Sequence, residues 1–295
     1  MRLLLFGILL LMGSVSSRRE RTRVMDRTLL FGAITKSSWL PVKAPMTEGI
    51  TSFIVNGNDA QRGNHPWLIS LQVYSRRRWV HICGGAILSP SVVVTAAHCF
   101  TFWGTLRHRV AAGWHILQEG SNQDQQNRIV RNIARHADYN KANKPGPNDI
   151  GLLFLEDPLD LTGFYVTEAR LARPGETFIG QRCVIAGWGR TRGSNTRLPK
   201  TLQSVEVPVI TLELCRRYWL INNRSNLANS NLCTHAAGNG TDALKNVCNG
   251  DSGGPLVCGD TVAGLVSWGR TGCVGCSPDV YTRIAFFYRW IMENQ

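Results

Sequence analysis

The run Gly250-Asp251-Ser252-Gly253-Gly254-Pro255-Leu256 decides how this 295-residue chain is interpreted. It places one serine between glycines, which adopt backbone dihedrals closed to other residues and let a second molecule approach closely. A loop of this kind can direct consecutive backbone N–H groups at one point, as the stabilisation of an oxyanion requires. The run therefore indicates a reactive serine, Ser252, beside a site for developing negative charge.

A serine hydroxyl is a weak nucleophile and needs a neighbouring base. The segment Thr95-Ala96-Ala97-His98-Cys99 supplies a histidine, and Asn148-Asp149-Ile150-Gly151-Leu152-Leu153 supplies a carboxylate. In chain order the candidates are His98, Asp149 and Ser252, the order of chymotrypsin-like proteases. Further motifs follow the same order: Ile54-Val55-Asn56-Gly57, Cys83-Gly84-Gly85, Gly187-Trp188-Gly189 and Ser267-Trp268-Gly269. From Ile54 to near its C-terminus the chain resembles secreted serine proteases of the chymotrypsin/trypsin family.

Short apolar runs between turn residues, among them 68–73, 92–94, 151–155, 205–207 and 262–266, are typical of an all-β protein. Ile284, Phe287 and Ile291 recur at helical spacing, which predicts a C-terminal helix over 285–293. The resemblance implies two packed six-stranded antiparallel β-barrels. It also implies that the triad lies in the cleft between them, with His98 and Asp149 from the first barrel and Ser252 from the second.

The N-terminal part is read as targeting and processing sequence. Arg2 precedes an apolar run from Leu3 to Met12, and small residues follow it, which is typical of a signal peptide at residues 1–17. The run is too short to span a bilayer. Residues 18–53, basic and then proline-containing, are predicted to be a pro-segment, and the resemblance implies that 54–295 are the protease domain. We expect a secreted protein, extracellular or in secretory granules, without a membrane anchor.

All nine cysteines follow Ile54. In a secreted chain disulfides are their default use, and their spacing is not that of a zinc site. The resemblance implies the pairs Cys83–Cys99, Cys183–Cys258, Cys215–Cys233 and Cys248–Cys273. Cys276 is left over, as a free thiol, an intermolecular bridge or a competitor with Cys273 for Cys248. Asn223-Arg224-Ser225 and Asn239-Gly240-Thr241 match the N-glycosylation pattern.

The formal net charge is +13, of which residues 54–295 carry about +8, and arginines form local clusters there: Arg76-Arg77-Arg78, Arg107/Arg109, Arg128/Arg131/Arg135, Arg190/Arg192/Arg197 and Arg216-Arg217. Such charge suits acidic partners, for example heparin-like glycans or anionic surfaces. The other interpretation is an ordinary solvated surface without a partner. Nothing in the sequence resembles a nucleic-acid-binding module, so no nucleic-acid partner is expected.

The resemblance also implies a role for each site residue. Ser252 attacks the peptide carbonyl, His98 transfers its proton, and Asp149 fixes the imidazole tautomer. Backbone N–H groups of Gly250 and Ser252 form the oxyanion hole. Ser267, Trp268 and Gly269 pair as an extended edge with the substrate backbone.

Activation in this family follows a cut before the Ile-Val motif. By resemblance the new amino terminus is Ile54, which inserts and pairs with Asp251. The preceding residue departs from the pattern, because Phe53 stands where trypsin-activated zymogens have Arg or Lys. Three routes stay open: a chymotrypsin-like activator, trimming after an upstream cut, or rare activation.

The specificity pocket departs from the family too. Its base is Asn246, where trypsin has an aspartate, and Gly269 leaves its mouth open. Asp279 occupies a wall position that is glycine in trypsin and chymotrypsin. It either meets a Lys or Arg side chain of the substrate or turns away into a structural hydrogen bond. Trp114 replaces the first glutamate of trypsin's calcium loop, and Pro278 replaces the tyrosine of sodium-activated relatives. We therefore expect no metal and no cofactor.

Together these features predict a secreted serine endopeptidase, made as a zymogen and working through an acyl-enzyme. We expect a preference for Arg/Lys or for mixed basic and aromatic residues before the cut. Its partners are protein or peptide substrates and protease inhibitors. The alternative, of a different class, is a catalytically silent basic binding protein on a protease scaffold, acting through its arginine clusters on heparin-like glycans or anionic surfaces.

Overall fold

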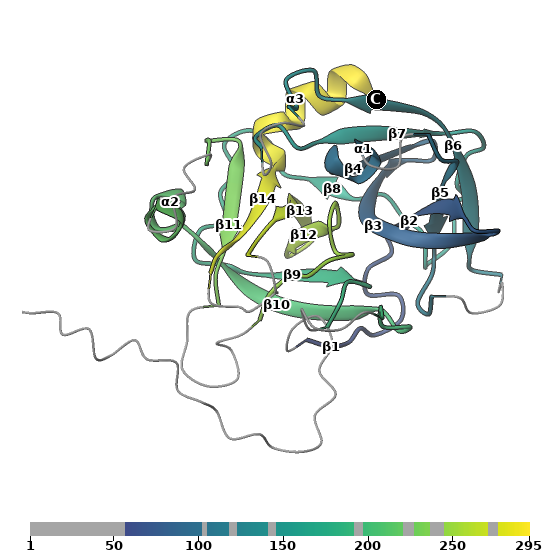
Figure 1. Cartoon of the computed structure of the whole chain (residues 1–295), viewed down its shortest axis with the longest axis horizontal. Coiled ribbons are helices and arrows are strands. Elements are labelled where there is room, and N and C mark those ends of the chain that lie inside the picture. Colours follow the sequence, from purple (N-terminus) through teal and green to yellow (C-terminus); the bar gives the residue numbers. More distant parts are fainter. Residues whose placement is uncertain are drawn as a thin grey trace, which may run out of the picture. The chain divides into compact units, whose positions relative to one another are not determined.

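The computed structural model describes residues 57–101, 105–117, 123–140, 146–191, 197–220, 227–236, 245–270 and 277–295. This part of the chain folds into antiparallel strands with three helices (Figure 1). The predicted signal peptide and pro-segment, Ile54, Asn223, Asn239, Cys273 and Cys276 lie outside the described residues. What the sequence predicts for them stays a prediction.

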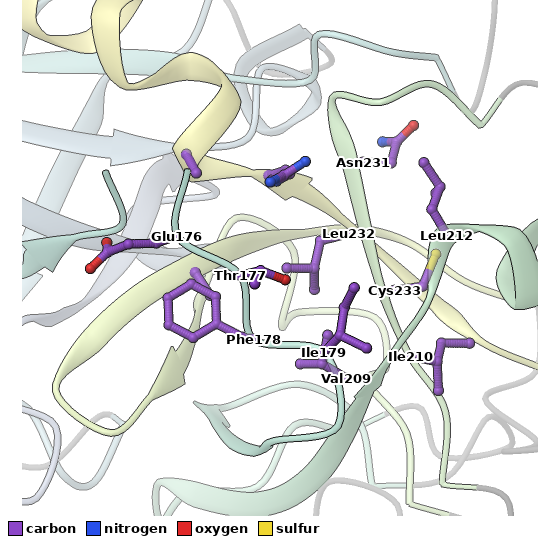
Figure 2. A pocket seen from close by; sticks show the side chains of 13 residues that line it. Glu176, Thr177, Phe178, Ile179, Val209, Ile210, Leu212, Asn231, Leu232 and Cys233 are labelled. Carbon is purple, nitrogen blue, oxygen red and sulfur yellow. The ribbon is translucent and has the colours of Figure 1, made fainter. Parts of the chain in front are cut away.

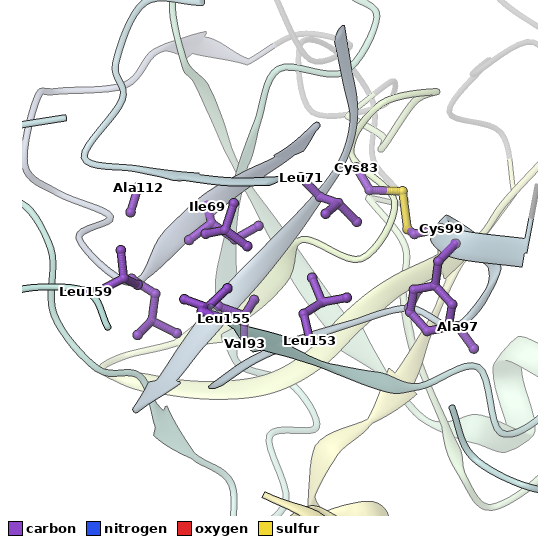
Figure 3. Packing of buried hydrophobic residues seen from close by; sticks show 14 of the residues in the cluster. Ile69, Leu71, Cys83, Val93, Ala97, Cys99, Ala112, Leu153, Leu155 and Leu159 are labelled. Carbon is purple, nitrogen blue, oxygen red and sulfur yellow. A yellow bond between two sulfur atoms is a disulfide. The ribbon is translucent and has the colours of Figure 1, made fainter. Parts of the chain in front are cut away.

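Six strands close the first barrel in the order β2-β3-β4-β7-β6-β5. Their bounds are β2 (Leu68–Ser75), β3 (Arg78–Ser89), β4 (Val92–Thr95), β5 (His108–Ala112), β6 (Gln126–Arg135) and β7 (Gly151–Leu155). Ile69, Leu71 and Leu153 are fully buried at the centre of this barrel (Figure 3). Burying each such side chain contributes about 1.5–3 kcal/mol. The apolar runs expected at 68–73, 92–94 and 151–155 thus become β2, β4 and β7.

Six strands also close the second barrel, because β9 pairs with both β10 and β12. Its strands are β9 (Arg182–Gly187), β10 (Gln203–Ile210), β11 (Asn231–Thr234), β12 (Pro255–Cys258), β13 (Thr261–Trp268) and β14 (Asp279–Arg283). Short β1 (Asn58–Asp59) extends the sheet beside β10, and β8 (Arg170–Leu171) pairs in parallel with β13. The two-barrel fold expected from the resemblance is confirmed.

One hydrophobic cluster joins the two barrels. It contains Val94, Ile150 and Leu152 from the first barrel and Val262 and Leu265 from the second. The C-terminal helix α3 (Ile284–Asn294) buries Ile284, Phe287 and Ile291 in the same cluster. Figure 1 shows α3 at the top of the view, over the region where the barrels meet. The predicted helix over 285–293 is therefore confirmed, one residue longer at each end.

Two other helices and three disulfides complete the described fold. The helices are α1 (His98–Thr101) and α2 (Leu212–Leu220). The disulfides Cys83–Cys99, Cys183–Cys258 and Cys215–Cys233 are formed, as the resemblance implies. Cys248 is disulfide-bonded too. Among the described helices, none has the length and hydropathy needed to cross a membrane.

Candidate active site

His98 is held by the end of the first barrel. Strand β4 leads through the fully buried Ala96 and Ala97 into α1, whose first residue is His98. The next residue, Cys99, is tied to β3 by the disulfide with Cys83, at the edge of the cluster in Figure 3. The backbone of His98 is thus fixed on both sides, while its ring is partly exposed.

Asp149 meets His98 through both carboxylate oxygens. Oδ1 accepts the backbone N–H of His98 at 2.9 Å, and Oδ2 lies 2.7 Å from Nδ1 of its ring. An ionised carboxylate only accepts hydrogen bonds, so Nδ1 carries the proton and Nε2 is left with its lone pair. The imidazole is therefore held in the tautomer that a general base requires.

The local backbone explains how Asp149 reaches that place. Asn148 has a φ of 60°, in the left-handed region that asparagine tolerates better than most residues. Ile150 and Leu152 then continue into the cluster between the barrels. The carbonyl oxygen of Asp149 accepts a 2.7 Å hydrogen bond from Oγ1 of Thr282, on β14 of the other barrel. Asp149 is consequently fixed by both barrels.

Ser267 adds a third hydrogen bond to the carboxylate of Asp149. Its hydroxyl donates to Oδ2 over 2.6 Å. The pairing of β13 with β14 shifts register between Val266 and Trp268, and such a bulge re-aims a side chain. Burial alone would raise the pKa of Asp149, but the charge of His98 and the hydrogen bonds from His98 and Ser267 outweigh it and lower that pKa. The carboxylate therefore stays ionised although it is buried.

Ser252 lies on the loop before β12, against the first barrel. Its carbonyl oxygen accepts the N–H of Gly84 at 2.8 Å. A Cβ on Gly253, whose φ is +75°, would collide with Oγ1 of Thr95 and lie 2.9 Å from the carbonyl oxygen of Gly84. Thr95 precedes His98 by three residues. The structure therefore brings the segment of Ser252 against the segment of His98, and only glycine fits at the contact.

Gly250 is anchored from the first barrel by His81. Its carbonyl oxygen accepts a hydrogen bond from Nε2 of His81 at 2.9 Å, and Nδ1 of that ring lies 2.7 Å from Oγ of Ser70. Desolvation by burial lowers the pKa of His81 to about 4, so the ring is neutral near pH 7. Gly250 has a φ of +109°, which side chains rarely adopt. This anchor for the oxyanion loop is not visible in the sequence, because His81 lies in no recognisable motif.

Asp251 is buried in a cradle made by the Gly-Trp-Gly motif. Its Oδ1 accepts the N–H of Gly189 at 2.8 Å, and its Oδ2 accepts the N–H of Cys248 at 3.0 Å. A Cβ on Gly187 or Gly189 would collide with this carboxylate, which explains both glycines. Burial raises the pKa of Asp251 to about 6. No basic side chain within the described ranges forms an ion pair with it.

The predicted specificity residues come together around buried polar atoms. Asn246 is 1% exposed, and neither atom of its amide has a hydrogen-bond partner among the described residues. Asp279 is 3% exposed, and its Oδ2 accepts the N–H of Val247 at 3.1 Å. Its Oδ1 has no such partner and would lie 2.6 Å from a Cβ on Gly269. Buried polar atoms without partners are costly, so the amide of Asn246 and Oδ1 of Asp279 are unsatisfied polar groups at the predicted specificity pocket.

The sequence left two roles for Asp279, a structural hydrogen bond and contact with a basic side chain of the substrate. Each role suits one of its two carboxylate oxygens. Oδ2 makes the structural hydrogen bond, and Oδ1 faces Gly269 at the predicted mouth of the pocket. Burial raises the pKa of Asp279 well above its usual range, and the nearby charge of Asp251 raises it further. Trp268 and Gly269 follow Ser267 at the end of β13 and are half-buried, as a surface strand for a substrate backbone would be.

Other candidate sites lie elsewhere or have a structural explanation. Cys83, His98 and Cys99 bring potential metal-ligating atoms within 4.8 Å, but both sulfurs are already joined in the disulfide. A small cavity of about 90 Å³ in the second barrel is lined by residues such as Phe178, Val209 and Leu232 (Figure 2). None of the predicted catalytic, oxyanion-hole or specificity residues lines that cavity, although the disulfide-bonded Cys233 does.

Comparisons with known proteins agree with this geometry. Residues 54–291 match the family described as Trypsin. The chain is 33% identical to a fibrinolytic enzyme, isozyme C, of Lumbricus rubellus, over 82% of this chain and 99% of that protein. It is 32% identical to a chymotrypsin-like serine proteinase of Haliotis rufescens, over 83% of this chain and 92% of that protein.

Solved structures give the same result. Neuropsin, a serine protease expressed in the limbic system of mouse brain, is 31% identical with a TM-score of 0.69, covering 80% of this chain and 97% of its own. The atomic-resolution structure of HBP is 32% identical with a TM-score of 0.68, covering 82% and 96%. The chain therefore belongs to the trypsin family of serine proteases and is a serine-type endopeptidase.

Proposed function

We propose that this chain cleaves peptide bonds with Ser252 as nucleophile, His98 as general base and acid, and Asp149 as the group that orients and stabilises the imidazole. The observation that carries the proposal is the 2.7 Å contact between Nδ1 of His98 and Oδ2 of Asp149. It leaves Nε2 as the basic nitrogen, beside a serine loop that packs against the same end of the first barrel.

The reaction follows from these positions. Oγ of Ser252 attacks the peptide carbonyl carbon while its proton passes to Nε2 of His98, and the carbonyl oxygen becomes an oxyanion. The imidazolium then protonates the amine that leaves, which gives an acyl-enzyme ester on Ser252. Water attacks this ester with His98 as base, and Ser252 regains its proton. Asp149 stays ionised throughout, consistent with its lowered pKa.

The oxyanion accepts hydrogen bonds from the backbone N–H groups of Gly250 and Ser252. Losing one such donor costs about 2.7–4 kcal/mol of transition-state stabilisation. Two contacts support a preorganised loop: Gly250 is bonded to His81, and Ser252 accepts the N–H of Gly84. Each anchor belongs to the first barrel, although the loop belongs to the second.

The burial of Asp251 supports activation by a cut before Ile54. A buried carboxylate is costly without a cation, because its water is lost and two backbone N–H groups replace it only in part. A cut between Phe53 and Ile54 would create an α-amino group that pairs with Asp251. The chain would accordingly be made as a zymogen, with Asp251 as the acceptor of the new terminus.

The pocket favours Arg or Lys before the cut, with aromatic residues accepted beside them. Oδ1 of Asp279 has no hydrogen-bond partner in the described part of the chain, so a cationic side chain would satisfy it and stabilise its charged form. The base is the neutral amide of Asn246, which repels an apolar ring less than trypsin's carboxylate does. Secretion after loss of residues 1–17, inhibition by protease inhibitors, and glycosylation at Asn223 and Asn239 complete the proposal.

A fluorophosphonate probe tests the proposal directly, because it reacts with an activated serine. Labelling is expected after controlled cleavage between Phe53 and Ile54, and not before it. Ser252→Ala should abolish labelling. Ser267→Ala, which removes another buried hydroxyl of the site, should still be labelled, although more slowly. Equal labelling of the Ser252 variant would identify a different nucleophile. A cleaved wild type that does not react would favour the catalytically silent binding protein.

A further inference from the structure

The hairpin between β2 and β3 contains two arginines where the backbone disfavours them. Arg76 and Arg77 form its two-residue turn, with φ values of 50° and 64°, and Ser75 pairs with Arg78 across it. Two positive φ values in a two-residue hairpin are those of a type I′ turn, which strongly favours Asn-Gly. A side chain in the left-handed region is strained by the contact of its Cβ with the following carbonyl oxygen.

Neither arginine gains contacts that would offset this strain. Both side chains are exposed, and so are Arg78 beside them and Arg107 on the adjoining segment. Arg107 is adjacent because its carbonyl oxygen accepts the N–H of Tyr74 at 2.9 Å. Arg76, Arg77, Arg78 and Arg107, which we call the arginine tip, form no ion pair with any described residue.

The strands beneath the tip contribute no acidic side chain. Strands β2, β3 and β5 contain neither Asp nor Glu. Several other surface arginines are already bound. Arg128 donates to the carbonyl oxygen of Pro158, Arg182 pairs with Glu206, and Arg217 pairs with Glu213. Arg131 and Arg135 of another cluster also form no ion pair with a described residue, so the tip is distinguished by having four such arginines together on one hairpin and the segment beside it.

The frame beneath the tip is rigid. The guanidinium of Arg109 lies 4.6 Å from the ring centroid of Trp79, and its Nε donates to Oε1 of Gln72 at 2.8 Å. Trp79 also packs against Tyr74, with ring centroids 5.3 Å apart. Arg109 covers one face of Trp79, while Tyr74 beside it is 45% exposed. These contacts fix the strands that carry the charged side chains of the tip.

We propose that the arginine tip binds a linear sulfated polysaccharide. Guanidinium groups form bidentate hydrogen bonds with oxyanions such as sulfate, and a polyanion releases counterions when it binds them. A docked acidic peptide would also need an apolar centre, as protein interfaces have, and the exposed ring of Tyr74 alone is a small one. The site lies on the outer side of the first barrel, on β2 and β3 at the right of Figure 1. The strained turn is retained because it presents two cations side by side.

The experiment compares two double variants that lose the same charge. Arg76→Asn/Arg77→Gly gives the turn its favoured residues, and Arg182→Gln/Arg217→Gln removes two ion-paired arginines elsewhere. Binding to immobilised heparin is measured over a series of salt concentrations, in a Ser252→Ala background so that the result does not depend on proteolysis. The turn variant should bind at least about tenfold more weakly, and its slope of log affinity against log salt should fall by about two. Its Tm should rise by about 2–4 °C as strain is relieved.

The control variant should keep its heparin affinity within about twofold, since its arginines are already paired with carboxylates. Equal losses in both variants would show that net charge, and not the tip, binds heparin. Unchanged binding of the turn variant would overturn the proposal outright. If a polyglutamate peptide competed as well as heparin does, the partner would be an acidic peptide and the assignment to a sulfated glycan would be wrong.

Discussion

The hydroxyl of Ser267 donates a 2.6 Å hydrogen bond to Oδ2 of Asp149, the same oxygen that receives Nδ1 of His98. One oxygen of the carboxylate therefore binds residues of both barrels, because Ser267 is on β13 of the second barrel and His98 begins α1 at the end of the first. The hydrogen bond from Ser267 stabilises the ionised form of Asp149 and lowers its pKa. Ser267 is thus a positioning residue for the proposed triad as well as part of the predicted substrate strand.

Ser267→Ala should lower kcat/KM by about tenfold, since a hydrogen bond to a charged group is worth about 1.5–3 kcal/mol. Without this donor the pKa of Asp149 should rise, so the acid limb of the pH–activity profile should move to higher pH. Ser267→Thr, which keeps the hydroxyl, should restore most of the activity. Steady-state kinetics over a pH series checks both effects. A loss of activity without any displacement of the acid limb would contradict the assigned hydrogen bond.

His81 should make the fold sensitive to acid. Its pKa is lowered from 6.5 to about 4 by burial, so between these values the unfolded chain binds a proton that the folded chain does not. The free energy of unfolding should therefore fall as pH falls from 6.5 to 4, by on the order of 3 kcal/mol from this group.

His81→Gln keeps a donor for the carbonyl oxygen of Gly250 and removes the titration. Urea unfolding at several pH values should show a flatter profile for this variant than for wild type. The comparison isolates His81, because His65, whose pKa is also lowered to about 4, is present in both proteins. Parallel profiles would mean that His81 does not carry the effect.

The fold could be predicted because its motifs are local and ordered along the chain. Apolar runs identified β2, β4 and β7, and the spacing of Ile284, Phe287 and Ile291 identified α3. Contacts between distant residues could not be predicted in this way. Ser267 and Asp149 are separated by 118 positions, and the bond between them depends on a bulge in β13. His81 and Gly250 are separated by 169.

Local sequence preference gives the wrong expectation for one turn and does not decide the orientation of one side chain. An Arg-Arg pair is not a signal for a type I′ turn, since both residues are strained there, yet Arg76 and Arg77 form one. For Asp279 the sequence left two interpretations open, because a residue name does not give the direction of each oxygen. The structure assigns one oxygen to Val247 and turns the other toward Gly269.

Asp279→Asn should distinguish the effect of negative charge on substrate preference from the effect of shape in the proposed specificity pocket. The amide has nearly the same volume as the carboxylate, so the pocket keeps its depth while losing its negative charge. The kcat/KM for Arg and Lys substrates should fall by about tenfold or more, as a charged partner is lost from a buried site. Cleavage after Phe or Tyr should change little.

The pH dependence gives a second readout for Asp279. Its pKa is raised by burial, so the carboxyl loses its proton only as pH rises through a value well above its usual range. In wild type the ratio of Lys to Phe cleavage should therefore grow with pH, and in Asp279→Asn it should stay level. Profiling a substrate library at several pH values measures the ratio. If the share of cleavage after Arg and Lys were unchanged in the variant, another residue would recognise the charge of the substrate.

Phe53→Arg should make the proposed zymogen activatable by trypsin, because trypsin cuts after Arg and does not cut after Phe. The new terminus at Ile54 would place an ammonium group beside Asp251, whose pKa is raised to about 6 while it has no cation. Breaking a buried pair of this kind costs about 3–5 kcal/mol, so its formation can order the oxyanion loop. Activity should appear in step with the fragment that begins Ile54-Val55, followed by N-terminal sequencing.

The matched control is Phe53→Arg/Asp251→Asn, in which trypsin makes the same cut but the acceptor has no charge. The loss of one oxyanion donor costs about 2.7–4 kcal/mol, so a disordered loop should lower kcat/KM by at least about a hundredfold. The asparagine can still accept one of the two backbone N–H groups now bound to Asp251, those of Gly189 and Cys248, which should preserve the fold. If the control became as active as the single variant, or if active material began at a residue other than Ile54, the pairing of Ile54 with Asp251 would be wrong.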